Sequence, residues 1–307
     1  MTLFNKKYPY ASIEFNQLVS NQVQAALDED IGTGDLTAQL VPATQLVRST
    51  IMAREPAIIC GIAWVNACFK QIDANVEIVW YIVEGERAQV NQVLCEIKGL
   101  ARTLLTAERC ALNFLQTLSA TATETRKYVD AIAGTQAQIL DTRKTIPHLR
   151  LAQKYAVTVG GGQNQRLALY DGILIKENHI AAAGSIAKVM AQAFALSSEP
   201  ASANKTASNA NISIQIEVED LNQLQQALDA GATSILLDNF STALLNEAVR
   251  TNQQFEKPAV LEASGGISLA NVREVALTGV DRISIGAITK NVQAIDFSMR
   301  ILSEEIK

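Results

Sequence analysis

From residue 138 onward the chain repeats one pattern, a short apolar segment followed by a loop and then, in several places, a helical stretch. The apolar segments show little polar–apolar alternation, which indicates strands buried on both faces, as in a parallel sheet. The helical stretches 220–232 and 268–279 each contain a glycine near the end that suits a helix C-terminus. This alternation predicts an α/β domain, and we expect a barrel. The candidate strands are 138–141, 172–178, 212–219, 233–239, 259–266 and 281–287.

Residues 48–99 have a different texture, with short apolar runs, partial alternation and a turn signal at Glu84-Gly85. These features predict several antiparallel strands. Residues 104–128 follow as a long helical pattern whose apolar residues lie near one face. The segment 197–213 is rich in Ser, Ala and Asn, which predicts an exposed loop between a helix and the next strand.

Charge and cysteine usage exclude several classes of protein. Lys and Arg number 26 against 31 Asp and Glu, and a net charge of -5 argues against non-specific nucleic-acid binding. No apolar run approaches the ~20 residues of a membrane span, and the first residues lack an export signal. We therefore expect a cytoplasmic protein in which the cysteines are reduced and buried. They are Cys60, Cys68, Cys95 and Cys110.

One region reverses the acidic balance. Residues 141–179 contain both histidines, the glycine triplet 160–162 and more basic than acidic side chains. An acidic protein that gathers cations in one region is expected to bind a polyanionic small molecule there. The basic residues are Arg143, Lys144, Arg150, Lys154, Arg166 and Lys176.

Charged residues or Ser/Gly turns stand at the end of nearly every candidate strand. In an α/β barrel these ends converge on one rim, where active sites are built. The alternative is that polar residues simply begin loops. We expect one shared site. The strand-end residues are Asp141 with Arg143 and Lys144, then Lys176, Glu217, Asp238, Ser264-Gly265-Gly266, and Ser284 with Gly286.

The residue types suggest roles for these positions. Arg and Lys suit carboxylates and phosphates, and turns after the last two strands occupy the usual phosphate position of such barrels. Glu217 and Asp238 could hold ribose hydroxyls, hold Mg²⁺, steady a cationic transition state, or pair with lysines. Lys176 could instead form a Schiff base, as in barrel aldolases. For His179 we expect a structural hydrogen bond, with acid–base work as the alternative.

Several motifs together resemble the quinolinate phosphoribosyltransferases, also called nicotinate-nucleotide pyrophosphorylases (carboxylating). The combination of TRKT, GGG-x-N-x-R and LIKENH is highly specific, and the matching segments span nearly the whole chain. They are EDIGTGDLT (29–37), LLTAERCALNFLQTLS (104–119), DTRKTIPHLRLAQKYAV (141–157), GGGQNQRLALYDGILIKENHI (160–180), IEVE (216–219), LLDNF (236–240), SGGI (264–267) and ISIGAITKNVQAIDFSMR (283–300).

The resemblance implies a fold and a reaction. It implies an N-terminal α/β sandwich domain, 1–128, with 291–307 packing back on it, and an incomplete α/β barrel, 129–290, of about seven strands. Pattern alone gives six. The implied reaction joins quinolinate to 5-phosphoribosyl 1-pyrophosphate, with Mg²⁺, to give nicotinate mononucleotide, pyrophosphate and CO2 in de novo NAD synthesis. The implied assembly is a homodimer in which Arg109 of one subunit reaches the substrate of the other.

The resemblance also assigns roles by position. Arg109, Arg143 and Arg166 would bind the quinolinate carboxylates, and the two strand-end turns would hold the 5-phosphate. Lys144 and Lys176 would contact pyrophosphate and quinolinate, while Glu217 and Asp238 would engage ribose and, indirectly, the metal. The expected catalytic residues are Lys144, Lys176, Glu217 and Asp238. The expected substrate-binding residues are these four with Arg109, Thr142, Arg143, Gln165, Arg166, Ser264, Gly265, Gly266, Ser284, Ile285 and Gly286.

The chain departs from the family pattern at Gln165, where the family usually has His. Gln can donate a hydrogen bond to a carboxylate but cannot carry a proton, so we expect altered affinity with turnover retained. His148 and Ala120-Thr121 also depart from the pattern. Two alternatives remain: a paralogous phosphoribosyltransferase-like protein with a different acceptor, linked to molybdenum uptake, and an inactive phosphosugar-binding protein. The retained cations favour a dicarboxylate acceptor, and intact Glu217 and Asp238 count against the second.

Overall fold

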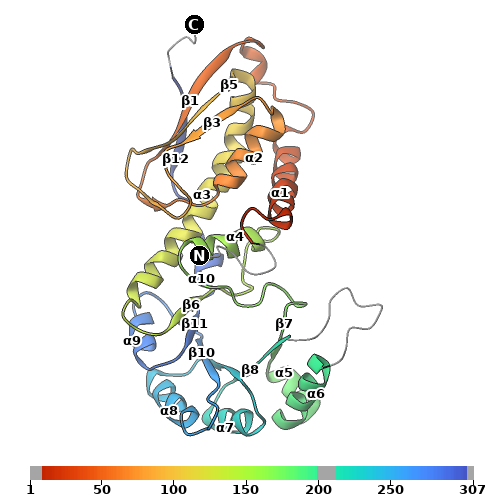
Figure 1. Ribbon diagram of the computed structural model, residues 1–307, viewed down its shortest axis with the longest axis vertical. Helices are drawn as coiled ribbons and strands as arrows, with labels where there is room; N and C mark the ends of the chain where they lie inside the picture. Colours follow the sequence, from red (N-terminus) through yellow and green to blue (C-terminus); the bar gives the residue numbers. More distant parts are fainter. Residues whose placement is uncertain (1–8, 199–211, 303–307) are drawn as a thin grey trace. The chain divides into compact units, whose positions relative to one another are not determined.

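The computed structural model describes residues 9–198 and 212–302, and the chain divides into two compact units (Figure 1). The helix α3 (Ala101–Ala131) runs from the first unit into the second. The first unit comprises Met1–Arg126, Thr145–Gly162 and Ile288–Lys307, and the second comprises Lys127–Lys144 and Gln163–Ala287.

The first unit is built on an antiparallel sheet of four strands in the order β12-β1-β5-β3, with a separate pair, β2-β4. The strands are β1 (Leu46–Ala53), β2 (Ala57–Ile58), β3 (Glu77–Trp80), β4 (Arg87–Ala88), β5 (Val93–Leu100) and β12 (Phe297–Ile301). The other elements are α1 (Ile13–Ile31), the 3-10 turn η1 (Ala38–Leu40), α2 (Ile62–Ile72), most of α3, α4 (Arg150–Val159) and α10 (Ala287–Lys290), whose first residue groups with the second unit.

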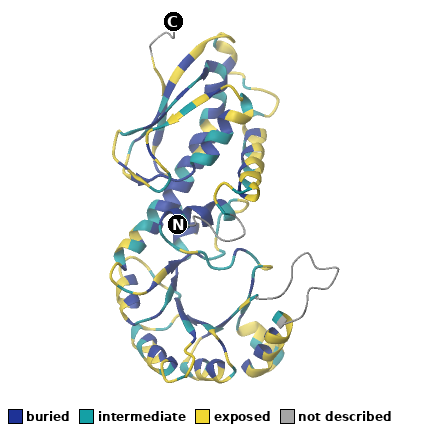
Figure 2. Cartoon of the chain, in the orientation of Figure 1, coloured by how far each residue is buried: buried dark blue, intermediate teal, exposed yellow. Residues whose placement is uncertain are grey.

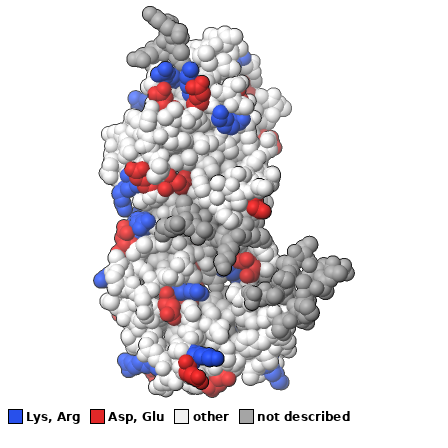
Figure 3. All heavy atoms as spheres, in the orientation of Figure 1, with Lys and Arg blue, Asp and Glu red and all other residues white. Residues whose placement is uncertain are grey.

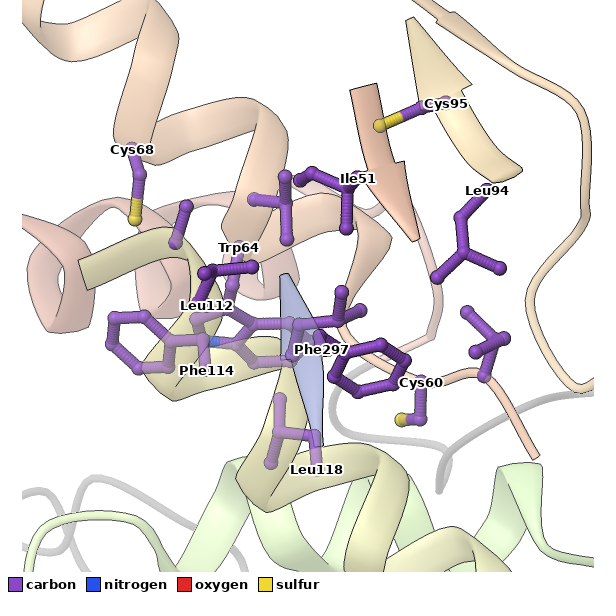
Figure 4. Close-up of a cluster of buried hydrophobic side chains, with 14 of the residues drawn as sticks. Ile51, Cys60, Trp64, Cys68, Leu94, Cys95, Leu112, Phe114, Leu118 and Phe297 are labelled. Carbon is purple, nitrogen blue, oxygen red and sulfur yellow. The ribbon is translucent and has the colours of Figure 1, made fainter. Parts of the chain in front are cut away.

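One face of this sheet forms a hydrophobic core with the helices. Residues of β1 alternate between buried and more exposed positions, as expected for an antiparallel sheet with one covered face. Trp64 is fully buried, and its ring lies edge-on to Phe15 with the centroids 5.6 Å apart. Figure 4 shows Trp64, Phe114 and Phe297 in this cluster. All four cysteines are buried, as predicted, and none of them forms a disulfide.

The helix α4 belongs to the first unit, although the resemblance placed all of 129–290 in the barrel. The reason is its apolar face, because Tyr155 packs against Phe15 and Trp64 at centroid distances of 5.2 and 5.5 Å. Near the other end of the described chain, β12 pairs antiparallel with β1. The first unit is therefore assembled from three separate stretches of sequence.

The second unit is a parallel sheet of six strands in the order β6-β11-β10-β9-β8-β7. Figure 2 shows its strands largely buried, with helices that expose their outer sides. The strands are β6 (Gln138–Leu140), β7 (Gly172–Ile175), β8 (Ser213–Val218), β9 (Ser234–Asp238), β10 (Val260–Ser264) and β11 (Arg282–Ser284). The helices are α5 (Glu177–Ala183), α6 (Ile186–Ser198), α7 (Leu221–Asp229), α8 (Thr242–Asn252) and α9 (Val272–Leu277).

The prediction of an α/β sandwich-like unit followed by an incomplete α/β barrel is confirmed, with one correction. The resemblance implied about seven barrel strands, whereas the described residues form six. A single parallel bridge between Leu140 and Gln163 stands beside β6, where a further strand would pair. Because Gln163 makes only this one bridge, the segment does not become a strand.

The predicted helices begin and end at the expected signals. Asp220 caps α7 by accepting a hydrogen bond from the Gln223 backbone N–H at 2.8 Å. Beyond the ends of α7 and α9, Gly231 and Gly279 have φ of +80° and +91°. The predicted loop 197–213 falls mostly outside the described residues.

Acidic and basic side chains are interspersed over the face in Figure 3. Among residues 9–198 and 212–302, no single helix has both the length and the hydropathy needed to cross a membrane.

Candidate active site

A cavity of about 670 Å³ lies within the second unit at the carboxyl ends of the parallel strands. Glu217 is in β8, and Asp238, Ser264 and Ser284 end β9, β10 and β11. Lys176 directly follows β7 and also faces the cavity. The strand ends therefore meet at one site, and the alternative of unrelated loop starts is wrong for this set. The lining residues are Thr142, Arg143, Lys144, Gln165, Arg166, Leu174, Lys176, Glu217, Leu236, Asp238, Asn239, Glu262, Ser264, Gly265, Gly266 and Ser284.

Three residues of the predicted binding set are not part of this lining. Arg109 is exposed on α3 in the first unit. Ile285 is buried, and its backbone N–H donates to the Leu140 carbonyl at 2.9 Å. A Cβ at Gly286 would come within 3.1 Å of Lys144 Cδ, so this turn lies directly against the Lys144 side chain.

Lys176 and Glu217 form an ion pair in the cavity. Lys176 Nζ lies 2.6 Å from Glu217 Oε2, and the Glu217 side chain is only 11% exposed. A Schiff-base lysine needs a nitrogen that is open to a substrate carbonyl, whereas Lys176 Nζ is engaged by the Glu217 carboxylate. The geometry therefore favours an ionic role for Lys176 over the imine alternative. His179 Nδ1 accepts a hydrogen bond from the Lys176 backbone N–H at 3.0 Å, which is the structural role expected for it.

Two guanidinium groups lie near each other beside this pair. Burial and then the neighbouring Arg143 lower the pKa of Arg166, while Glu217 acts in the opposite direction. Arg166 Nη1 also donates to the Gly172 carbonyl at 3.1 Å, which fixes the side chain. Bringing two cations together costs electrostatic energy that a ligand with two negative groups would offset.

Asp141 holds the two basic segments of the site together. It is fully buried, and its carboxylate accepts hydrogen bonds from Asn164 Nδ2 at 2.7 Å and from the Gln165 backbone N–H at 2.9 Å. The segment that carries Arg143 is thereby joined to the one that carries Arg166. The sequence marked Asp141 as a strand-end residue but gave no sign of this organising role.

The turn after β10 is closely packed against the end of β9. Gly265 has a φ of +96°, and a Cβ there would lie 2.0 Å from Asn239 Oδ1. Asn239 in turn donates from Nδ2 to Asp238 Oδ2 at 2.8 Å and from its backbone N–H to the Ser264 carbonyl at 2.9 Å. Glycine is therefore required at position 265 both for its conformation and for its size.

The sequence analysis did not identify two candidate functional residues, Gln215 and Glu262. Both are buried inside the barrel, and Gln215 Nε2 donates to Glu262 Oε2 at 2.9 Å. Burial raises the pKa of Glu262, while hydrogen bonds from Gln215 and Ser284 act in the opposite direction. The available signal was a polar residue in the middle of an otherwise apolar strand, which the pattern analysis passed over.

Comparison with known proteins covers almost the whole chain. Residues 35–119 match the family model for the N-terminal domain of quinolinate phosphoribosyl transferase, and residues 121–300 match that for its C-terminal domain. A probable nicotinate-nucleotide pyrophosphorylase [carboxylating] of Bacillus subtilis is 39% identical over 90% of this chain and 91% of its own length. The corresponding protein of Mycobacterium leprae is 38% identical over 90% of this chain and 95% of its own. The solved nicotinate-nucleotide pyrophosphorylase of Francisella tularensis superposes with a TM-score of 0.86 at 42% identity, covering 94% of this chain and 97% of that one.

Proposed function

The chain belongs to the quinolinate phosphoribosyltransferase family, and from this membership we propose that it transfers the phosphoribosyl group of 5-phosphoribosyl 1-pyrophosphate to quinolinate with decarboxylation. The products are nicotinate mononucleotide, pyrophosphate and CO2, in de novo NAD synthesis. The observation that carries the proposal is the single cavity in which four basic side chains and two strand-end carboxylates meet.

Recognition of quinolinate rests on paired guanidinium groups. Arg143 and Arg166 are mutual neighbours in the cavity, and each can hold a carboxylate through two parallel N–H donors. Gln165 lines the same cavity and can add an uncharged hydrogen bond. We assign these three residues to the acceptor dicarboxylate.

We assign the phosphoribosyl donor to the other side chains of the cavity. Lys144 and Lys176 supply positive charges that contact the pyrophosphate of the donor and also quinolinate. The turns at 264–266 and 284–286 follow the last two barrel strands, where backbone N–H groups commonly hold a phosphate. Glu217 and Asp238 come from the paired strands β8 and β9 and engage the ribose.

The chemistry follows from this division. The C1–O bond to pyrophosphate breaks and leaves positive charge on the ribose, which Glu217 and Asp238 stabilise. The pyridine nitrogen of quinolinate then forms the N–C1 bond. Its new positive charge accepts the electron pair released when the adjacent carboxylate leaves as CO2, and a proton takes the vacated carbon. Aligning acceptor and donor supplies much of the rate enhancement, since no covalent enzyme intermediate is needed.

We also propose Mg²⁺ as the cofactor. Among the described residues there is no cluster of three or more potential ligands from Asp, Glu, His or Cys. Glu217 and Asp238 are hard oxygen donors on neighbouring strands, and Mg²⁺ sites are commonly completed by substrate phosphates and water. They therefore fit an indirect site, in which bound Mg²⁺ supplies charge neutralisation of the pyrophosphate.

The test is direct. Purified protein is incubated with quinolinate, the donor and Mg²⁺, and nicotinate mononucleotide is measured. Replacing quinolinate by nicotinate tests whether the second carboxylate is required and addresses the alternative of a different acceptor. We expect product with quinolinate, and a loss of about 10- to 150-fold in kcat/KM for Arg166→Met, because a hydrogen bond to a charged group is worth about 1.5–3 kcal/mol. Absence of product from both acceptors would refute the proposal.

We further propose a homodimer in which Arg109 of one subunit completes the site of the other. Arg109 is exposed on α3 and does not line the cavity of its own chain. Mixing Arg109→Ala with Lys176→Ala, each inactive alone, would regenerate some intact sites if the subunits exchange. If no activity is regained although the subunits are shown to exchange, a shared site is excluded.

We infer a cytoplasmic location, where the four free thiols would stay reduced.

A further inference from the structure

Three hydrogen-bonded side chains lie along the wall of the cavity, and two of them, Glu262 and Gln165, belong to its lining. Glu262 is 1% exposed, and its Oε2 accepts from Gln215 Nε2 at 2.9 Å. Gln215 is 7% exposed, and its Oε1 accepts from Gln165 Nε2 at 2.7 Å. Gln165 is the member farthest from the interior and is half-buried. Gln215 lies on β8 and Glu262 on β10, so these hydrogen bonds cross the sheet beneath the strand ends.

Glu262 fixes the direction in which the hydrogen bonds between these three side chains run, from donor to acceptor. A carboxylate oxygen accepts hydrogen bonds, so the Gln215 amide must turn its nitrogen towards Glu262. Its oxygen then faces Gln165, which must donate with its own nitrogen. The Gln215 amide has only one orientation that satisfies both of its neighbours. Gln165 therefore reaches the cavity with its amide nitrogen and oxygen in defined positions.

We propose that Gln215 and Glu262 are positioning residues that orient the Gln165 amide for the acceptor substrate. This inference rests on the proposed function for the identity of that acceptor, a pyridine dicarboxylate. The physical effect is preorganisation. Ordering one long side chain in advance removes a cost that binding would otherwise bear, which corresponds to roughly two- to twelvefold in affinity.

The central variant is Gln215→Met, which keeps the length of the side chain but neither donates nor accepts a conventional hydrogen bond. We expect the KM for quinolinate to rise about two- to tenfold. The kcat and the KM for the phosphoribosyl donor should stay within about twofold, because the proposed function assigns Gln165 to the acceptor and not to the donor. Glu262→Met should raise the KM for quinolinate by a similar factor, and because Ser284 also bonds to Glu262, only the quinolinate KM of this variant bears on the proposal. Glu262→Gln should restore near-normal behaviour, since its amide oxygen can still accept from Gln215.

A double-mutant cycle separates positioning from general damage. If Gln215 acts through Gln165, then Gln215→Met should change the quinolinate KM little once Gln165→Met is already present. Equal effects in both backgrounds would overturn the proposal, as would a Glu262→Gln variant that behaves like Glu262→Met. A Gln215→Met variant whose only change is a lower Tm would do the same.

The matched control is another buried amide of the second unit, which does not belong to the cavity lining. Asn252 is 5% exposed, and its side chain both donates to the carbonyl and accepts from the N–H of Ala259, at 2.8 Å each. Asn252→Leu should lower the Tm and leave the quinolinate KM unchanged. A rise in KM equal to that of Gln215→Met would show that loss of any buried amide suffices, and would overturn the proposal.

Calorimetric binding of quinolinate to each variant distinguishes failure of this inference from failure of the proposed function. A protein that binds quinolinate but forms no nicotinate mononucleotide would refute the proposed function alone. The positioning role would then be decided by the dissociation constants of the same variants. Glu262→Gln should match the unmodified protein, and Gln215→Met should bind more weakly by the predicted factor.

Discussion

Replacement of Gly265 by Ala gives a stringent test of the cavity wall. The new Cβ would meet Asn239 Oδ1 at 2.0 Å, Asn239 Cγ at 2.7 Å and the Asn239 backbone nitrogen at 3.0 Å. The Asn239 side chain must therefore move, and its 2.8 Å hydrogen bond to Asp238 Oδ2 is lost. The φ of +96° adds strain, because an L-residue is disfavoured there.

The expected magnitude is the sum of two modest effects. Left-handed backbone costs about 1–2 kcal/mol for a residue with a Cβ, and loss of a partly exposed hydrogen bond costs about 1 kcal/mol. We expect the free energy of unfolding to fall by about 2–3 kcal/mol. Activity should fall further, since a displacement of about 1 Å in a reacting group can cost about 100-fold in rate, and Asp238 loses its partner.

Gly231→Ala is the matched control. Gly231 has a φ of +80° just after α7, and a Cβ there would meet no atom within 4 Å. It should therefore show the backbone strain of about 1–2 kcal/mol without loss of activity. Urea unfolding and kcat/KM for both substrates are measured for each variant. Equal stability and equal activity of the two variants would refute the steric argument.

Three further changes have expected outcomes that follow from single contacts. Gln165→His should change kcat/KM for quinolinate by less than about tenfold, because a ring nitrogen can still donate to Gln215; a gain of several orders of magnitude would contradict a merely modulating role. Burial raises the pKa of Glu262 above 4.5, so the folded state binds its proton more tightly than the unfolded chain, and the stability of the unmodified protein should fall as pH rises through the raised pKa. Denaturation of Glu262→Gln at pH 4 and pH 8 should accordingly show a stability advantage over the unmodified protein only at pH 8. Glu84 accepts from the backbone N–H groups of Gly61 at 2.8 Å and Ile62 at 3.1 Å, so Glu84→Ala should lower the unfolding free energy by about 2–4 kcal/mol, and an unchanged urea midpoint would show that these N–H groups find other partners.

The sequence was informative about the cavity because strand periodicity and strand ends are local properties. A run such as 233–239 identifies a buried strand, and the residue at its end, Asp238, follows from the run itself. Parallel strands bring their ends to one edge, so the shared location of Lys176, Glu217 and Asp238 needed no knowledge of distant contacts. The same reasoning predicted the barrel unit and the antiparallel strands of the first unit, whereas the sandwich architecture followed from the family resemblance.

What the sequence did not predict depends on contacts between distant segments. The 2.9 Å contact between Gln215 and Glu262 crosses an intervening strand, and nothing within either strand specifies it. The membership of α4 in the first unit depends on Tyr155 meeting the Phe15 and Trp64 rings. The missing barrel strand has the same kind of cause, since Gln163 makes only a single bridge to Leu140. Pattern gives each element its type, but its partners are decided by packing.

The charges in the cavity connect the proposals for metal and for assembly. Its lining holds Arg143, Lys144, Arg166 and Lys176 against three acidic residues, Glu217, Asp238 and Glu262, a surplus of basic side chains. Two carboxylates of quinolinate and three phosphoryl groups of the donor bring on the order of five or more negative charges. The cavity of one chain therefore leaves much of this charge unbalanced. A divalent cation and one more guanidinium would reduce the deficit, which is the physical argument for Mg²⁺ and for Arg109 from a second subunit. Mg²⁺ should then matter most once the donor is bound, so omitting Mg²⁺ should weaken binding of the donor more than binding of quinolinate alone.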